Sequence, residues 1–237
     1  MRDCLIIIPT YNEEVNIKKV LSDIRELYSN IDTLVINDGS TDNTEKVVQN
    51  EKVMLISLPY NLGYGGALQT GYKYAVLAGY EYVIQIDGDG QHDPEDIRLI
   101  IEKMQKGIDI VIGSRFLGRG SYKTSFIKII AIRIFRSIIN ISTKVKITDP
   151  SSGLQGLSKR AFSYYAKIGN FPPDYPDADI LIQMIINGYK IVEFPANIRE
   201  RKHGTSMHAG LRPIVYFFKL LVSILIVLLR PKSVVEG

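Results

Sequence analysis

The stretch Y-V-I-Q-I-D-G-D-G-Q-H-D-P-E-D-I, from Tyr82 to Ile97, decides how the rest of the chain is interpreted. Its first five residues, 82–86, are mostly apolar and β-branched, which is typical of a buried strand. Its end, Asp93-Pro94-Glu95-Asp96, offers an N-cap, a proline for the first helical position and an acidic first turn. We therefore predict a strand, a tight turn and a helix.

Two carboxylates, Asp87 and Asp89, stand in this turn with a single glycine between them. Side chains of like charge at this spacing repel each other, and a divalent cation that carries phosphates relieves the repulsion best. The two glycines of the turn let the backbone approach a ligand closely. Gln91 and His92 add polar atoms beside the pair. The turn is thus a candidate metal site, although Asp-Gly pairs also form ordinary acidic surface turns.

The composition favours one α/β domain with appendages. The chain has 237 residues, of which 46% are hydrophobic, so it is able to form a sizeable core. The net charge of +4 is small and argues against a nucleic-acid partner. Cys4 is the single cysteine, which excludes an intrachain disulfide and is compatible with a reducing compartment. No signal-peptide pattern precedes the first expected strand.

The first half of the chain alternates expected strands and helices. The expected strands cover residues 5–8, 33–37, 53–58, 82–86 and 109–112, and a helical pattern follows each of the first four. Short turns join these elements. Right-handed crossovers then produce a mainly parallel central sheet with helices on both faces. The fold class we predict is therefore α/β.

Polar residues follow the expected strands where each of them ends. Asn12 and Glu13 follow the first strand, Asp38 follows the second, and Asp87 and Asp89 follow the fourth. In open α/β sheets, ligands bind in the crevice beyond the carboxyl ends of the strands. We therefore expect a nucleotide site, in which acidic side chains hold the ribose and base while a metal holds the phosphates.

A dinucleotide-binding fold is the competing interpretation. Gly63-x-Gly65 looks like part of its glycine fingerprint, but Leu68 stands where the third glycine belongs. The first expected strand also leads into Pro-Thr-Tyr-Asn rather than into glycines, and no G-x-x-x-x-G-K-[ST] phosphate loop occurs. Close packing at a helix start is a simpler role for these glycines.

Five motifs together resemble one known family. They are I-I-P-T-Y-N-E, V-I-N-D-G-S-T-D-N-T, N-L-G-Y-G-G-A, D-G-D-G-Q-H-D-P-E and G-S-R-F, in this order along the chain. They resemble the family 2 glycosyltransferases, and within them the branch with dolichyl- or polyprenyl-phosphate mannosyltransferases. The resemblance covers roughly residues 4 to 206. It implies the nucleotide-sugar-binding GT-A fold and an inverting transfer from a nucleotide-diphosphate sugar donor.

The resemblance also implies roles on the nucleoside side of the site. At the matching positions of the family motifs, Pro9, Tyr11 and Glu13 would border the nucleoside. Asp38 would hold the base or the ribose.

Further roles concern the diphosphate. Asp87 would sit by the ribose and the metal, and Asp89 with Gln91 would bind the metal, either Mg²⁺ or Mn²⁺. Arg115, in G-S-R-F, would face the diphosphate and assist catalysis. Taken without the other motifs, Arg115 looks like a surface arginine after a strand.

Three stretches of the second half match the acceptor side of the family. T-D-P-S-S-G-L-Q-G, at residues 148–156, matches the loop T-D-x-x-S-G, although it also fits an ordinary Asp-Pro turn. Asp177 and Asp179 match two acids of which one acts as base or orients the acceptor; both also suit the N-terminus of a helix. Arg201 would hold a phosphate and Ser206 would bind substrate, with methionine in place of the family lysine that follows.

Two apolar segments concern membranes. Isoleucines recur at helical spacing over residues 127–141 opposite basic side chains, which predicts a helix on an anionic membrane surface or one packed on its own domain. Residues 214–229 are almost wholly apolar. At ~1.5 Å per residue such a helix spans roughly 24 Å, less than the ~30 Å hydrocarbon core. We expect an interfacial anchor, or a helix that docks on a separate small membrane protein.

The predicted organisation is a catalytic domain, 1–210, and a membrane-associating or partner-docking helix, 211–231. Within the domain, residues 1–117 form the donor half and 118–210 the acceptor half. The predicted function is metal-dependent glycosyl transfer to a polyprenyl phosphate or lipid-linked intermediate at the cytoplasmic face of the membrane. A saccharide hydroxyl is the alternative acceptor and would need Asp177 as base. Two other classes stay open, a nucleotidyltransferase and a non-catalytic nucleotide-sugar-binding membrane subunit.

Overall fold

The computed structural model describes residues 3–118, 126–172, 176–199 and 212–229. Within these residues a seven-stranded sheet has the order β3-β2-β1-β4-β6-β5-β7. The strands are β1 (Cys4–Thr10), β2 (Asp32–Asn37), β3 (Met54–Ser57), β4 (Tyr82–Gln85), β5 (Ile110–Ser114), β6 (Gln155–Ser158) and β7 (Ile191–Pro195). Neighbouring strands run parallel except at β6, which is antiparallel to both β4 and β5. The predicted α/β class and mainly parallel sheet are confirmed.

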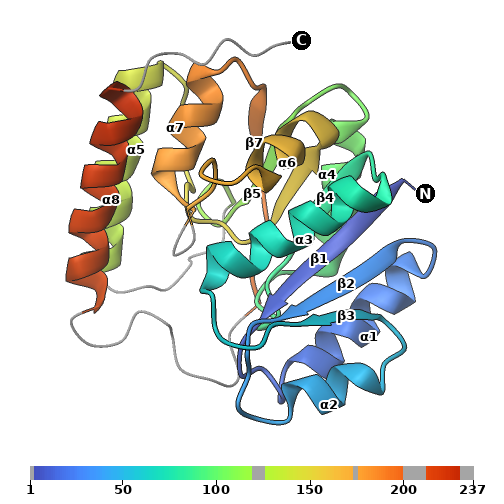
Figure 1. Ribbon diagram of the computed structural model, residues 1–237. Helices are drawn as coiled ribbons and strands as arrows, with labels where there is room; N and C mark the ends of the chain where they lie inside the picture. Colours follow the sequence, from blue (N-terminus) through green and yellow to red (C-terminus); the bar gives the residue numbers. More distant parts are fainter. Residues whose placement is uncertain (1–2, 119–125, 173–175, 200–211, 230–237) are drawn as a thin grey trace.

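The helices cover both faces of this sheet (Figure 1). They are α1 (Ile17–Tyr28), α2 (Thr44–Gln49), α3 (Tyr64–Ala78), the 3₁₀ turn η1 (Pro94–Asp96), α4 (Ile97–Met104), α5 (Phe126–Thr143), α6 (Lys159–Ala166), α7 (Ala178–Ile186) and α8 (Arg212–Leu229). Helices α1, α2 and α4 share one apolar core with the sheet. Helices α3, α6 and α7 share the other core, which also takes in residues of α5 and α8.

Strand β1 shows why the sequence folds in this way. All seven of its residues are buried, and its side chains alternate between the two cores. Leu5 and Ile7 point into the core of α3 and α6, while Ile6 and Ile8 point into the core of α1 and α4. A strand that is buried on both faces is continuously apolar, as expected in a parallel sheet covered by helices.

Two features of the sheet differ from the prediction. The first strand was expected to end before Pro9, but β1 continues to Thr10. Proline is tolerated because β1 pairs with β4 only as far as Ile7, so Pro9 has a single neighbouring strand. Strand β6 was not predicted, because its first two residues, Gln155 and Gly156, close the T-D-P-S-S-G-L-Q-G motif, which was interpreted as a loop. By pairing with β4, it brings the loop 148–154 beside the Asp87 turn.

Helix α8 packs on its own domain through Leu220 and Ile224, which are both buried in the core around α7. No helix in the described part of the chain is long and apolar enough to cross a membrane. An anchoring role for α8 therefore stays a prediction, and so does the division of the domain into donor and acceptor halves. Strands from both of these halves, 1–117 and 118–210, belong to one sheet.

Candidate active site

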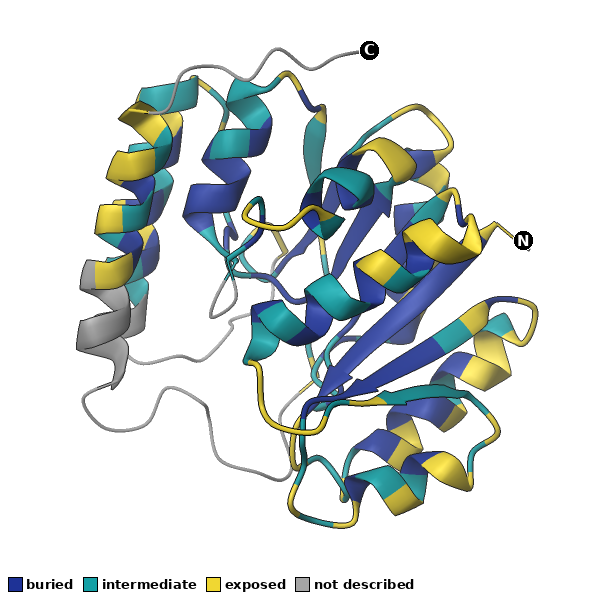
Figure 2. Cartoon of the chain, in the orientation of Figure 1, coloured by how far each residue is buried: buried dark blue, intermediate teal, exposed yellow. Residues whose placement is uncertain are grey.

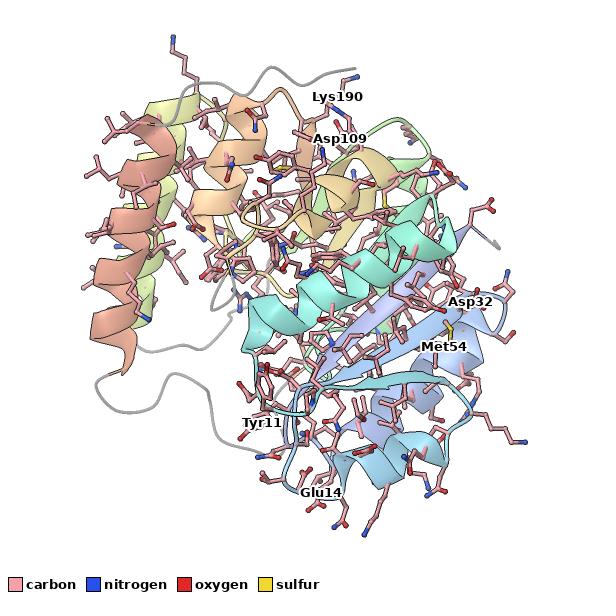
Figure 3. All side chains as sticks on the ribbon, viewed as in Figure 1. Tyr11, Glu14, Asp32, Met54, Asp109 and Lys190 are labelled. Carbon is pink, nitrogen blue, oxygen red and sulfur yellow. The ribbon has the colours of Figure 1, made fainter. Side chains whose placement is uncertain are left out.

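The loops that follow β1, β2 and β4 meet at the carboxyl end of the sheet. Figure 3 shows Tyr11 and Glu14 at this end, whereas Asp32 and Asp109, near the starts of β2 and β5, lie away from it. Tyr11 exposes 43% of its surface beside this end, and Pro9 is buried below it. The structure thus brings together the residues that the motifs predicted for a nucleotide site.

The loops after β1 and β2 are joined by hydrogen bonds between side chains and backbone. The Asn12 side-chain Oδ1 accepts from the Thr41 backbone amide at 2.8 Å, and the Thr44 hydroxyl accepts from the Glu13 backbone amide at 2.8 Å. The Glu13 carboxylate accepts a hydrogen bond of 2.7 Å from the Asn16 side chain. These contacts hold two separate motifs as one wall of the site.

Asp38 is buried below this wall and organises a third loop. Its two carboxylate oxygens accept from the backbone amides of Leu62, at 2.7 Å, and Gly63, at 3.0 Å. Burial raises the pKa of Asp38 above its usual value in spite of these two bonds. Gly63 has φ +86°, a conformation that favours glycine, which explains its place directly before α3. In this structure Asp38 holds the start of α3, and its contact with a base or ribose stays a prediction.

Asp87 lies just beyond the end of β4, between two side chains. The Tyr64 hydroxyl donates to its Oδ1 at 2.9 Å, and the His92 Nε2 lies 3.5 Å from its Oδ2. Burial opposes its ionisation, but the bonds from His92 and Tyr64 and the charge of Arg115 outweigh burial. The pKa of Asp87 therefore lies below its usual value, and its binding of a cation stays a prediction.

Gly153 is the residue that makes room for this carboxylate. A Cβ atom at position 153 would lie 1.9 Å from the Asp87 Oδ2, far closer than any real contact. Because Gly153 belongs to the loop 148–154, the donor side and the predicted acceptor side of the site are in direct contact here. The T-D-P-S-S-G motif thus ends in glycine because any larger residue would collide with Asp87.

Asp89 and Gln91 complete the turn after β4. The backbone amide of Gln91 donates to the Asp89 Oδ1 at 3.0 Å, and both residues are partly exposed. Among the described residues, no three His, Cys, Asp or Glu side chains gather in a group that could hold a metal ion. The oxygen donors of Asp87, Asp89 and Gln91 suit Mg²⁺ or Mn²⁺, provided that the remaining ligands come from water and substrate phosphates.

Arg115 was predicted to contact a diphosphate, and in the structure it contacts side-chain and backbone groups of the protein. Its Nε and Nη2 lie 2.7 Å from the Oδ2 and Oδ1 of Asp149, and Nη2 also donates to the Ser151 carbonyl at 2.9 Å. Glu193 on β7 accepts from the backbone amides of Thr148 and Asp149. Arg115 therefore fixes the acceptor-side loop, and its contact with the diphosphate stays a prediction.

Arg136 of α5 lies next to this network. Its Cζ stands 4.5 Å from the ring centroid of Phe116, which also stacks near Arg115. Burial lowers the pKa of Arg136 in spite of the nearby charges of Asp149 and Glu193. Its Nε and Nη2 are buried and have no hydrogen-bond partner among the described residues. An anion is the natural ligand for such a group.

Asp177 directly precedes α7, which shares one apolar core with α3. Its charge acts on the Tyr64 phenol, which in turn donates to Asp87. Asp179 is 4% exposed and is buried in the first turn of α7. The predicted substrate-binding residues Arg201 and Ser206 lie outside the described residues.

Several residues of this site were not singled out by the sequence. Tyr64 and Gly153 belong to the quoted motifs N-L-G-Y-G-G-A and T-D-P-S-S-G, so the signal was present but carried no assigned role. Asp149 belongs to the second of these motifs. Arg136 stood only among the basic residues of an amphipathic helix, and no pattern distinguished it from Arg133.

Comparison with known proteins agrees with this geometry. An uncharacterised protein of Methanocaldococcus jannaschii is 32% identical over 93% of this chain and 91% of its own length. A polyprenol monophosphomannose synthase of Mycolicibacterium smegmatis is 25% identical over 87% of this chain and 81% of its own length. A UDP-N-acetylglucosamine–dolichyl-phosphate N-acetylglucosaminyltransferase of Methanococcus voltae is 34% identical over 68% of this chain and 72% of its own length.

A solved structure and a family model complete the comparison. Glucosyl-3-phosphoglycerate synthase from Mycobacterium tuberculosis, in complex with Mn²⁺ and uridine-diphosphate-glucose, has a TM-score of 0.67 at 20% identity. The match covers 96% of this chain and 79% of that one, and it supports the GT-A fold. The model of the family described as glycosyl transferase family 2 matches residues 5–165. This chain therefore belongs to glycosyl transferase family 2, and it is a glycosyltransferase that uses a nucleotide-sugar donor.

Proposed function

We propose that this enzyme transfers a sugar, with inversion, from a nucleotide-diphosphate donor to a polyprenyl phosphate at a membrane surface. The observation that carries this choice of acceptor is Arg136, whose buried Nε and Nη2 have no hydrogen-bond partner among the described residues. Buried guanidinium nitrogens without hydrogen-bond partners are costly, and a phosphate relieves that cost with two charge-assisted hydrogen bonds. A neutral hydroxyl acceptor gives no such compensation.

The donor occupies the carboxyl end of the sheet. The exposed Tyr11 and the wall that contains Glu13 border the nucleoside, and Asp38 shapes the loop that faces it. Asp87, Asp89 and Gln91 would hold a divalent cation together with the diphosphate. When it is bound, the cation neutralises the negative charge that develops on the departing nucleotide diphosphate.

The acceptor side lies across Gly153. The pair of Arg115 with Asp149 holds the loop 148–154 in place. Arg136 lies near Asp149 of that loop, with two donors that have no hydrogen-bond partner in the described part of the chain. The names of two relatives, a polyprenol monophosphomannose synthase and a dolichyl-phosphate N-acetylglucosaminyltransferase, support a lipid phosphate as acceptor. Arg136 would bind the acceptor phosphate and leave one phosphate oxygen to react.

The chemistry needs no strong base when the acceptor is a phosphate. An acceptor oxygen that is already anionic near neutral pH forms the new bond to the anomeric carbon. The bond from this carbon to the diphosphate breaks on the opposite face, and its electron pair leaves with the nucleotide. Asp177 then orients the acceptor. If a saccharide hydroxyl were the acceptor, Asp177 would have to accept a proton.

An apolar surface on α8 suits contact with a membrane. Val222, Leu225 and Ile226 are 58%, 57% and 48% exposed, whereas the core around α7 takes in Leu220 and Ile224. Figure 2 shows exposed positions, in yellow, along α8. Isolated exposed apolar residues are common, but a row of them on one helix marks an interaction surface. A polyprenyl tail enters the site from the bilayer, so we place the enzyme at the membrane surface, and at its cytoplasmic face, where nucleotide sugars are supplied.

The test compares acceptors and an arginine variant. Wild-type enzyme is incubated with nucleotide sugars, Mn²⁺ and either polyprenyl phosphate or the corresponding polyprenol, and release of nucleotide diphosphate is measured. We expect release with polyprenyl phosphate and none with polyprenol. In Arg136→Gln, kcat/KM for polyprenyl phosphate should fall about tenfold or more. Lys146→Gln, at an exposed lysine beyond α5, is the matched control. Equal use of both acceptors, or an unaffected Arg136→Gln, contradicts the proposal.

A variant of Asp177 distinguishes a phosphate acceptor from a hydroxyl acceptor. With a phosphate acceptor, Asp177→Asn is expected to reduce turnover by no more than about tenfold, because no proton has to be removed. A near-total loss would favour the hydroxyl acceptor instead. Donor binding, followed as a shift in thermal stability with Mn²⁺ and nucleotide sugar, should be unchanged in this variant.

A further inference from the structure

Among the described side chains, a polar contact joins α8 to α7 beside apolar packing. The Ser223 hydroxyl donates to the Asp179 Oδ2 at 2.5 Å. On either side of this serine, Leu220 and Ile224 are 3% exposed and pack in the core. Apolar packing alone would hold the two helices together, so the serine and the buried carboxylate need a separate explanation.

The other oxygen of this carboxylate binds the backbone at the start of α7. The Asp179 Oδ1 accepts from the Ile180 amide at 2.8 Å and from the Asp177 amide at 3.3 Å. The Asp177 side chain makes no capping hydrogen bond to the helix. Asp179 therefore fixes the backbone of the turn that carries Asp177, and Ser223 holds Asp179 from the opposite side.

The same turn is coupled to the candidate active site. The charge of Asp177 acts on the Tyr64 phenol, and Tyr64 donates to Asp87 at 2.9 Å. A series of hydrogen bonds, with one electrostatic step between Asp177 and Tyr64, thus leads from α8, which carries the exposed apolar row, to the carboxylate beyond β4. Figure 1 shows α7 between α8 and the sheet, as this series requires.

We propose that Ser223 is a positioning residue for Asp177, acting through Asp179, so that the acceptor side is fully formed only when α8 is docked on α7. The inference rests on the proposed function insofar as Asp177 orients the acceptor. It extends that function by making the membrane-facing helix part of the catalytic apparatus. The hydrogen bond from Ser223 to Asp179, and not merely the bulk of the serine side chain, positions Asp177.

The physical basis is the number of donors to a buried carboxylate. Without the hydroxyl, the donors to Asp179 among the described residues are backbone amides alone. A buried carboxylate that loses a partner moves toward other donors or toward water. Either movement weakens the bonds from Oδ1 to the amides of Asp177 and Ile180. The first turn of α7 then opens more often, and Asp177 spends less time in the position from which it orients the acceptor.

Hydrogen exchange tests this step without relying on any activity. The backbone amides of Asp177 and Ile180 are followed by NMR in the full chain. We expect Ser223→Ala to exchange at least about tenfold faster at both amides, and Ser223→Thr, which keeps the hydroxyl, to stay within about twofold of wild type. Ser142→Ala is the matched control, because that hydroxyl donates only within α5, to Ile138 and Ile139. Unchanged exchange in Ser223→Ala overturns the proposal.

A double-mutant cycle then tests the link to Asp177. We expect Ser223→Ala to lower kcat/KM for polyprenyl phosphate by about tenfold, with donor affinity unchanged, and to have no further effect in an Asp177→Asn background. A loss of equal size in both backgrounds would show general destabilisation and contradict the positioning role. If wild-type enzyme does not use polyprenyl phosphate, the proposed function fails. The exchange measurement still decides the role of Ser223.

Discussion

Arg115 and Asp149 form a two-point ion pair in which Nε and Nη2 of the arginine lie 2.7 Å from the two carboxylate oxygens. The Asp149 side chain is fully buried, and the Arg115 side chain is 15% exposed. The arginine of G-S-R-F therefore holds the acceptor-side loop in place. It also contributes, by its charge, to the low pKa of Asp87. One residue thus serves both sides of the site.

Removal of one partner of this pair should be strongly destabilising. We expect Asp149→Asn to lower the free energy of unfolding by about 3 kcal/mol or more, because an uncompensated guanidinium stays buried. Glu102→Gln, in the exposed pair with Arg98, should change it by about 0–1 kcal/mol. Urea denaturation measures both changes. Equal effects of the two substitutions would contradict the structural role given to Asp149.

Gly153 should be indispensable for donor binding. In Gly153→Ala the new methyl group displaces the Asp87 carboxylate, since its Cβ would lie 1.9 Å from Oδ2. We expect the affinity for nucleotide diphosphate in the presence of Mn²⁺, measured by calorimetry, to fall at least about tenfold. Gly107→Ala is the control for steric contact, because nothing lies within 4 Å of its Cβ. Its φ of +78° adds a conformational cost that Gly153, whose φ is not positive, does not bear, so any loss in the control gives an upper limit for the backbone effect. A normal affinity in Gly153→Ala would refute the contact.

Asp179 should make stability depend on pH in a defined direction. Burial raises the pKa of Asp179 in the folded state above its usual value. The folded chain therefore binds more protons than the unfolded chain at pH values between about 3.9, the unfolded pKa of an aspartate, and the higher pKa of the folded state. The contribution of Asp179 to stability is complete below that pH and decreases as the pH rises through the folded pKa.

The measurement compares wild type with Asp179→Asn by urea denaturation between acidic and neutral pH. The stability advantage of wild type is expected to be largest at the acidic end and to shrink as the pH rises. An advantage that grows with pH would show that the pKa of Asp179 is lowered on folding, contrary to the account given above.

The exposed row on α8 should govern binding to lipid vesicles. We expect Leu225→Asp to weaken binding to anionic vesicles by about tenfold, since it removes an apolar side chain from the interface. Leu77→Asp is the matched control, because Leu77 is 87% exposed but lies on α3. Vesicle sedimentation measures both variants. A similar loss in the Leu77 variant would show that the contact with lipid is not specific to α8.

Local signals in the sequence were sufficient for much of the fold. The cap at Asp93 is confirmed, since its side chain accepts from the Glu95 amide at 3.1 Å and Pro94 begins the turn η1. The strands before Asp38 and Asp87 were predicted because continuous apolar runs led into polar turns. Their convergence followed from the parallel topology, in which the carboxyl ends of strands meet at one edge.

Features that depend on distant contacts could not be read from the sequence. Strand β6 has four residues and exists because β4 and β5 flank it, which no local pattern announces. The partner of Arg115 is Asp149, and the two are far apart in the chain. The hydrogen bond from Ser223 of α8 likewise goes to Asp179, a residue for which the sequence suggested only helix capping or a role in catalysis.

The most direct test of the account is metal-dependent release of nucleotide diphosphate from a panel of nucleotide sugars with polyprenyl phosphate, comparing wild type with Asp89→Asn. We predict release by wild type that requires Mn²⁺ or Mg²⁺, stops on addition of a chelator, and falls about a hundredfold or more in the variant. Release that is equal in Asp89→Asn, or that persists without a divalent cation, would contradict the account.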